Sequence, residues 1–155
     1  MKILLAVDQD RASFDAAAVV SDWFSDDAEV VALHVGSRVP TTAVAAPIAT
    51  TGIGYPSFAL PLLRNERERI YLEACEIAER AAAVTHGDVR TEAGDPATKI
   101  IEVAAEIGAD LIVIGTGDRS WLSRVFAPSV SDKVVHNAPC PVLVVRPADD
   151  EEASS

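Results

Sequence analysis

Three carboxylates lie next to the ends of predicted strands or helices, where parallel sheets often carry functional residues. Asp8 directly follows the apolar run Lys2–Val7, Asp10 comes two residues later, and Asp95 precedes Pro96. Clustered acids of this kind bind Mg²⁺ in phosphoacceptor sites, but no lysine follows the last strand to complete such a site. Asp95 is better explained as a helix cap in front of Pro96. Asp8 keeps two interpretations: it contacts a ribose, an adenine or a metal, or it is a solvated loop acid or helix cap.

The histidines and cysteines do not form a catalytic set. His34, His86 and His136 belong to different expected elements, which favours packing or surface roles over a shared site. Cys75 and Cys140 lack metal-type or redox-type spacing, and they are expected to be reduced thiols in the cytoplasm. No nucleophile–base pair is evident. The sequence therefore predicts no catalytic residues and no metal site.

Charge and composition restrict the class of protein further. The 155 residues include 24 acidic and 13 basic ones, a formal net charge of −11, and 49% are apolar. A nucleic-acid binder needs a basic surface, so this class is excluded. The apolar content is that of one folded domain. The apolar run Ile3–Val7 is too short to span a membrane or to act as a signal peptide, and we expect a cytoplasmic protein.

Apolar runs alternate with amphipathic segments along the chain. Such alternation builds an α/β fold, an open parallel five-stranded sheet with helices on both faces. Ligands bind such sheets at the carboxyl ends of the strands, where Asp8, Val35 and Gly115 lie. The expected strands are 2–7, 29–35, 88–93, 110–114 and 142–145, with 88–93 at an edge. The expected helices follow Asp10 and span 64–85, 96–107 and about 129–136.

Two parts of the chain depart from this alternation. The segment from about 36 to 63 holds four of the nine prolines, which predicts a long mobile loop. Limited proteolysis should cut first between Thr41 and Phe58 and in the tail. Residues 148–155 are acidic or small, and we expect them to be disordered. The folded domain is thus predicted to span residues 1–147.

Several segments, in order, resemble the universal stress protein family. They are Ala6-Val7-Asp8, Leu33-His34-Val35, Gly94-Asp95-Pro96, Gly108 to Thr116, Arg119-Ser120, Leu122-Ser123-Arg124 and Ala138 to Arg146. The resemblance covers nearly the whole chain apart from the 36–63 segment and the tail. It implies the strand order 3-2-1-4-5, homodimers often joined through the final strand, and ATP binding in many members.

The family's nucleotide motif is only partly present. It reads Gly-x-x-Gly, nine further residues, then Gly-Ser or Gly-Thr, and its glycines let backbone N–H groups approach phosphates. Gly115 matches the first glycine, whereas Asp118 and Pro128 occupy the second and third positions. Gly117 lies one position early, and no glycine follows it. Proline removes a donor and aspartate repels a polyphosphate, so weak or absent ATP binding is predicted.

The resemblance also implies the candidate site residues. For nucleotide they are Ala6, Asp8, Val35, Gly115, Gly117, Arg119, Ser129 and Val130. We predict a non-enzymatic stress-response protein with a degenerate nucleotide pocket. The alternative is a switch that binds ATP with Mg²⁺ through an altered phosphate loop, and a weak ATPase is the one activity left open.

The final strand is the predicted dimer interface. Its residues Val142, Leu143, Val144 and Val145 are all apolar, although the strand order places them at an edge. An exposed apolar edge invites pairing with another chain, and self-pairing about a two-fold axis would cover it. We also expect a regulatory protein partner, which the sequence does not identify.

Overall fold

The computed structural model describes residues 1–9, 11–24, 27–36, 59–116 and 130–146. The segment 37–58, the phosphate-loop region 117–129 and the tail from 147 onward lie outside the described residues. The predicted parallel sheet is confirmed, with the order β3-β2-β1-β4-β5. Its strands are β1 (Lys2–Val7), β2 (Glu29–Gly36), β3 (Asp88–Ala93), β4 (Leu111–Gly115) and β5 (Val142–Val145).

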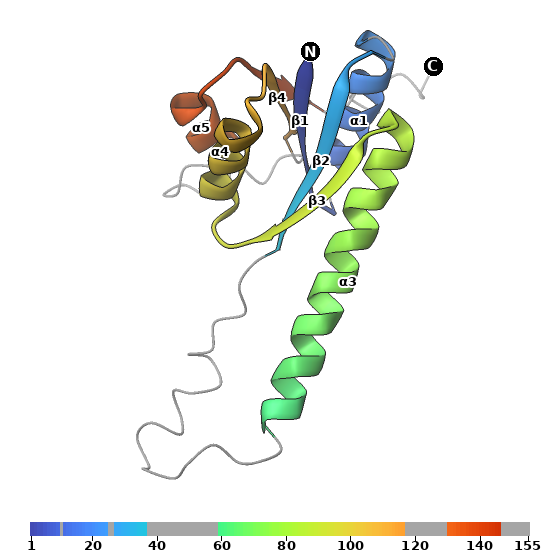
Figure 1. The fold of residues 1–155 in the computed structure, drawn as a ribbon, viewed down its shortest axis with the longest axis vertical. Coiled ribbons are helices and arrows are strands. Elements are labelled where there is room, and N and C mark those ends of the chain that lie inside the picture. The colour runs from blue at the N-terminus through green and yellow to red at the C-terminus, as the bar shows by residue number, and fades with distance from the viewer. Residues whose placement is uncertain (10, 25–26, 37–58, 117–129, 147–155) are drawn as a thin grey trace, which may run out of the picture.

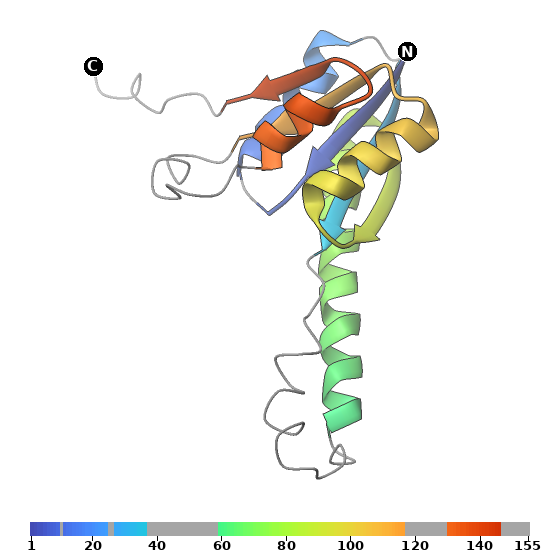
Figure 2. The same ribbon diagram turned by 90° about the vertical axis from the view of Figure 1, so that its left-hand side faces the viewer.

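Helices cover both faces of the sheet (Figure 1 and Figure 2). One face packs against α1 (Arg11–Trp23) and α3 (Ala59–Thr85), and the other against α4 (Pro96–Ile107) and α5 (Val130–Asn137). Because successive side chains of a strand point to opposite faces, β1 serves both cores. Ile3, Leu5 and Val7 join the α1/α3 core, while Leu4 and Ala6 join the α4/α5 core.

Helix α3 begins at Ala59 and not at the expected Arg64. A proline in the first turn of a helix is tolerated, because its missing N–H would have no partner within the helix. Pro61 therefore does not delay the start of the helix. Gly36 belongs to β2 and residues 59–63 belong to α3, so the expected loop 36–63 included residues of both elements. The amino-terminal part of α3 extends beyond the sheet (Figure 1 and Figure 2), and Ala74 is the first buried side chain described along it.

The ends of α4 follow the sequence closely. Asp95 is the N-cap, and its carboxylate accepts a hydrogen bond from the Thr98 N–H at 3.0 Å. Pro96 occupies the first turn, and Gly108 ends the helix in the left-handed conformation with φ 62°. These caps set the position of α4 over β1, β2 and β4, and the cap interpretation of Asp95 is confirmed.

Candidate functional site

The carboxyl ends of β1, β2 and β4 meet at one edge of the sheet. In the sheet register Ala6 lies beside Leu33 on β2 and Ile114 on β4. Asp8 directly follows β1, and Val35 and Gly115 lie at the ends of β2 and β4. The structure thus brings four of the predicted nucleotide residues, Ala6, Asp8, Val35 and Gly115, to the same edge.

These four residues do not all face the same way. Ala6 and Val35 lie on the face covered by α4 and α5, where Ala6 is buried and Val35 is partly buried. Gly115 instead faces α1, because a Cβ atom added there would lie 2.2 Å from the Ala12 carbonyl oxygen. The small size of Gly115 is therefore required by the packing of α1 against β4, whatever the ligand.

Asp8 lies in a turn that is held by a buried serine. The Asp8 side chain is exposed, and its Oδ1 accepts a hydrogen bond from the Gln9 N–H at 2.8 Å. The Asp8 N–H donates to Oγ of Ser13 at 2.8 Å, and Ser13 is only 4% exposed. The carboxylate thus points into solvent from a fixed backbone, as either interpretation of Asp8 requires.

His34 makes a second contact with the same turn. It lies on β2 and is 8% exposed, and its Nδ1 is 2.9 Å from the Val7 carbonyl oxygen. A carbonyl only accepts hydrogen bonds, so Nδ1 carries the proton. The expectation that His34 packs at a strand end is confirmed, but the contact with Val7 was not foreseen. The signal available in the sequence was a polar side chain inside a buried strand, which needs a partner.

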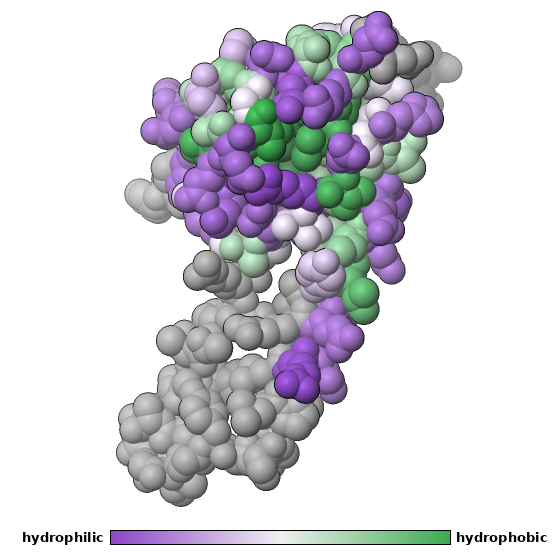
Figure 3. Space-filling model, viewed as in Figure 1, coloured by the Kyte–Doolittle hydropathy of each residue, from purple (hydrophilic) through white to green (hydrophobic). Residues whose placement is uncertain are grey.

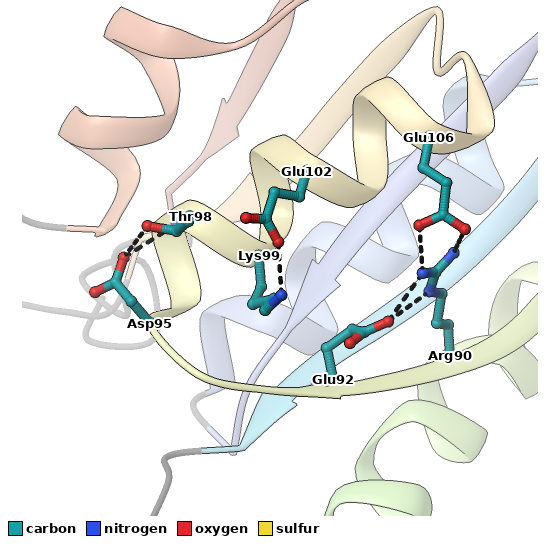
Figure 4. Close-up of polar contacts among 7 residues, drawn as sticks. All are labelled: Arg90, Glu92, Asp95, Thr98, Lys99, Glu102 and Glu106. Carbon is teal, nitrogen blue, oxygen red and sulfur yellow. Dashed lines mark hydrogen bonds and ion pairs between the residues drawn. The ribbon is translucent and has the colours of Figure 1, made fainter.

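The carboxylates on the α4 side are engaged with neighbouring groups (Figure 4). Asp95 Oδ2 accepts hydrogen bonds from the hydroxyl and the N–H of Thr98, which together hold the Asp95 pKa below its usual range. Arg90 on β3 bridges Glu92 and Glu106, with its Nη2 2.9 Å and 2.7 Å from the respective carboxylate oxygens. Hydrophilic side chains cover much of the surface over α4 and β3 in Figure 3.

A cavity of about 350 Å³ lies between α4 and α5. Its lining includes Asp95 and Thr98 on α4 and Lys133 and Asn137 on α5. Lys133 Nζ is 4.0 Å from Asp95 Oδ1, so the two charges partly balance. The predicted strand-end residues do not line this cavity. Across the described parts of the chain, no three His, Cys, Asp or Glu side chains gather to hold a metal ion.

The segment that leads from β4 to α5 in the expected phosphate site lies outside the described residues. Val130 begins α5, and its side chain is 38% exposed. Gly117, Arg119 and Ser129 lie outside the described residues, as do Asp118 and Pro128. The structure therefore places the strand-end residues of the expected site and the start of α5, and the residues between β4 and α5 lie outside its described part.

The final strand presents an unpaired edge. Among the described strands, β5 pairs only with β4. The Thr116 N–H donates to the Val145 carbonyl at 2.8 Å, so the backbone groups of Val145 face β4. Because backbone groups alternate along a strand, those of Val142 and Val144 face the open edge. Val144 is 36% exposed, whereas Leu143 and Val145 pack into the α1/α3 core.

Both cysteines are free. Cys140 packs beside the α4/α5 core, and burial, followed by the nearby charge of Asp110, raises the pKa of its thiol. A raised pKa keeps the thiol protonated and poorly nucleophilic.

None of the helices in the described ranges combines the length and apolar character needed to cross a lipid bilayer.

Comparison with known proteins gives a consistent result. The family model described as "Universal stress protein family" matches residues 1–146. The universal stress protein YxiE of Bacillus subtilis is 36% identical over 149 residues, covering 94% of this chain and 98% of that protein. A crystal structure of an Arabidopsis thaliana member with AMP bound aligns with a TM-score of 0.61 at 19% identity, covering 100% of this chain and 97% of that one. A universal stress protein in complex with cAMP aligns with a TM-score of 0.60 at 20% identity, covering 96% and 98%.

Proposed function

This chain belongs to the universal stress protein family, and from that membership we propose a non-enzymatic regulatory role in the stress response. In this role the protein acts as a homodimer with a degenerate nucleotide pocket and binds ATP weakly or not at all. A protein partner, as yet unidentified, receives the signal. Two free cysteines without a disulfide suit a reducing cytoplasm, which is the location we propose.

The observation that carries this proposal is the altered phosphate motif. Asp118 and Pro128 replace two glycines whose backbone N–H groups would bind phosphates. Proline has no N–H to donate. Aspartate adds a like charge, whose repulsion at ~4 Å is about 1 kcal/mol in water and about 4 kcal/mol at an intermediate dielectric. Together these changes weaken ATP binding by roughly 3 kcal/mol, about a hundredfold.

The predicted nucleotide residues at the strand ends support an alternative. Ala6, Asp8 and Val35 share the strand-end edge. Two solved relatives hold AMP and cAMP, which each carry a single phosphate group. An adenine nucleotide with one phosphate makes less demand on the altered loop than ATP does. The second candidate function is therefore a switch governed by an adenine nucleotide at this edge, either ATP with Mg²⁺ or a nucleotide with one phosphate.

Isothermal titration with ATP, ADP and AMP, each with and without Mg²⁺, distinguishes these functions. We expect the ATP dissociation constant to exceed about 100 μM, a binding free energy weaker than roughly −5.5 kcal/mol. The double substitution Asp118→Gly with Pro128→Gly should strengthen ATP binding. Protein that carries stoichiometric ATP through gel filtration would favour the ATP switch, and sustained phosphate release would contradict the non-enzymatic role.

A further inference from the structure

We propose that Ser13 and His34 are positioning residues for the strand-end nucleotide site, acting together as a clamp on the Val7–Asp8 peptide group. The Val7 carbonyl accepts from His34 Nδ1 at 2.9 Å, and the Asp8 N–H donates to Ser13 Oγ at 2.8 Å. Both polar atoms of one peptide unit are thus bound by side chains. The inference rests on the second candidate function, an adenine nucleotide bound at the strand ends, for both the location and the ligand of the site.

Burial sets these two side chains apart from the other polar side chains in the described ranges. Ser13 and His34 are the two polar side chains that are buried in the described part of the chain, 4% and 8% exposed. They come from α1 and β2, which are separate elements, yet both bind the peptide at the end of β1. Buried polar groups need hydrogen-bond partners, and here both find them on the same peptide.

The serine side of the clamp is itself held in place. A Cβ atom on Gly115 would lie 2.2 Å from the Ala12 carbonyl oxygen and 2.9 Å from the Ser13 nitrogen. The first turn of α1 therefore rests directly on the end of β4. Because interiors are close-packed, Ser13 has little freedom to follow a moving turn. The clamp fixes the plane of the Val7–Asp8 peptide relative to β2 and β4, which are the two neighbours of β1.

The clamped peptide lies where a ligand would meet the protein. Ala6 precedes it at the sheet edge, and the exposed Asp8 carboxylate follows it. A binding group is effective when supporting residues hold it in the productive orientation before the ligand arrives. Without the clamp the turn rotates, and part of the binding free energy is lost in ordering it.

A merely structural role makes a different prediction. If the two side chains serve stability alone, then any variant that remains folded should bind a ligand as the wild type does. A positioning role predicts lower affinity in folded variants and recovery when the donor is restored in the same place. Asparagine at position 34 places its amide N–H close to the position of Nδ1, whereas glutamine places it close to that of Nε2.

The test is titration of the full chain with AMP, followed by ¹⁵N–¹H NMR, in the wild type and in five variants. Ser13→Ala, His34→Leu and His34→Gln should weaken AMP binding about tenfold, the effect of losing one net hydrogen bond. His34→Asn should retain wild-type affinity within about twofold. Val20→Ala is the control, because Val20 is buried in α1 but distant in sequence from the turn. It should lower stability without changing AMP affinity.

Hydrogen exchange of the Asp8 amide gives a second readout that needs no ligand. It should quicken in Ser13→Ala and stay slow in Val20→Ala. If His34→Leu does not fold, the contrast between His34→Asn and His34→Gln decides the role of His34. Equal AMP affinity in all folded variants, or an equal loss in Val20→Ala, would overturn the proposal.

Different results would overturn the positioning role of Ser13 and His34 and the proposed function of the protein. A wild type that shows no saturable response to about 10 mM AMP would overturn the positioning role and leave the non-enzymatic, nucleotide-independent function standing. Tight ATP binding would overturn the degenerate pocket, while the variant series would still report on the clamp.

Discussion

Gly115 occupies the closest approach between β4 and α1. Substitution Gly115→Ala would place a Cβ atom 2.2 Å from the Ala12 carbonyl oxygen, so backbone must shift. We expect the free energy of unfolding to fall by about 1–3 kcal/mol or more, in the absence of any nucleotide. Urea unfolding measures the change.

Gly108→Ala is the matched control for this substitution. Nothing lies within 4 Å of a Cβ atom at Gly108, and its φ of 62° is the only source of strain. The expected loss is about 1 kcal/mol, due to the left-handed conformation alone. A Gly115→Ala variant no less stable than Gly108→Ala would show that the α1–β4 contact yields easily.

His86 adopts a conformation that suits glycine better. It follows the end of α3 with φ 52°, and the next residue, Gly87, donates its N–H to the Ala82 carbonyl at 3.0 Å, as in a Schellman cap. His86→Gly should raise the free energy of unfolding by about 0.5–1 kcal/mol, because glycine adopts positive φ without strain. Thermal unfolding would detect the gain. His86→Ala should show none, and an equal gain there would point to the imidazole and not to the backbone.

The candidate site shows which of its residues can be inferred from a sequence. Asp8, Val35 and Gly115 were located because apolar runs reveal where strands end, and parallel strands end at one edge. Ala6 was implied by the family resemblance alone. Ser13 and His34 were not assigned to that edge. Their contacts join side chains of two elements to the backbone of a third, and no spacing along the chain encodes such a contact. Gly115 was predicted as a nucleotide-binding glycine, and that role stays a prediction; in the structure its small size is required by the packing of α1.

The start of α4 gives stability that depends on pH. Hydrogen bonds from the Thr98 hydroxyl and N–H lower the pKa of Asp95 from its ordinary value of 3.8. A depressed pKa contributes stability that is complete above the unfolded value and is lost as the pH falls through the folded value. We expect the Asp95→Asn variant to keep the cap at neutral pH, since asparagine caps as well as aspartate. Its stability should fall less steeply below about pH 4.

Chemical denaturation at a series of acidic pH values measures this slope. Glu106→Gln is a useful companion, because the hydrogen bond from Arg90 lowers the pKa of Glu106 in the same direction. Each substitution should remove only its own part of the acid sensitivity. An Asp95→Asn variant with the full wild-type slope would mean that Asp95 has the same pKa in both states.

Most elements were predictable because buried positions carry apolar residues at a regular spacing along the sequence. The apolar strands β1, β2, β4 and β5 and the capped helix α4 follow their predicted bounds to within about a residue at each end. The start of α3 was missed because Pro61 was counted among the prolines of the expected loop. Proline breaks a helix only beyond its first turn. The first residue of a helix depends on the path of the chain before it in the folded protein. The local helix propensity of the sequence does not encode that path.

The two edge strands of the sheet differ in how well they are protected against pairing with another chain. On β3 the charged pair Arg90 and Glu92 occupies the strand, and Arg90 is tied to Glu106 of α4. Charged side chains on an edge strand discourage pairing with another sheet. On β5 the side chains are all valine or leucine, and the backbone groups of Val142 and Val144 face outward. Of the two edges, β5 is the one suited to a partner strand.

We therefore predict that the protein is a homodimer joined through β5. Two copies pairing antiparallel about a two-fold axis would continue the two sheets into one. The exposed Val144 would then lie in the interface, together with Val142, which is partly buried against the α4/α5 core. Leu143 and Val145 stay in the α1/α3 core. Val144→Pro removes an N–H that faces the open edge, so it should weaken the dimer sharply and leave the β4–β5 ladder intact.

Sedimentation velocity across a range of concentrations tests this arrangement. Wild-type protein should sediment as a dimer at ~50 μM, a concentration that requires a free energy of association of about −6 kcal/mol. Val144→Ala keeps the N–H and should remain largely dimeric, which separates the backbone contribution from that of the side chain. Leu143→Pro is the opposite control, because its N–H faces β4 by the same alternation and its loss should destabilise the monomer itself. A wild type that is monomeric at this concentration, or a Val144→Pro variant as dimeric as the wild type, would place the interface elsewhere.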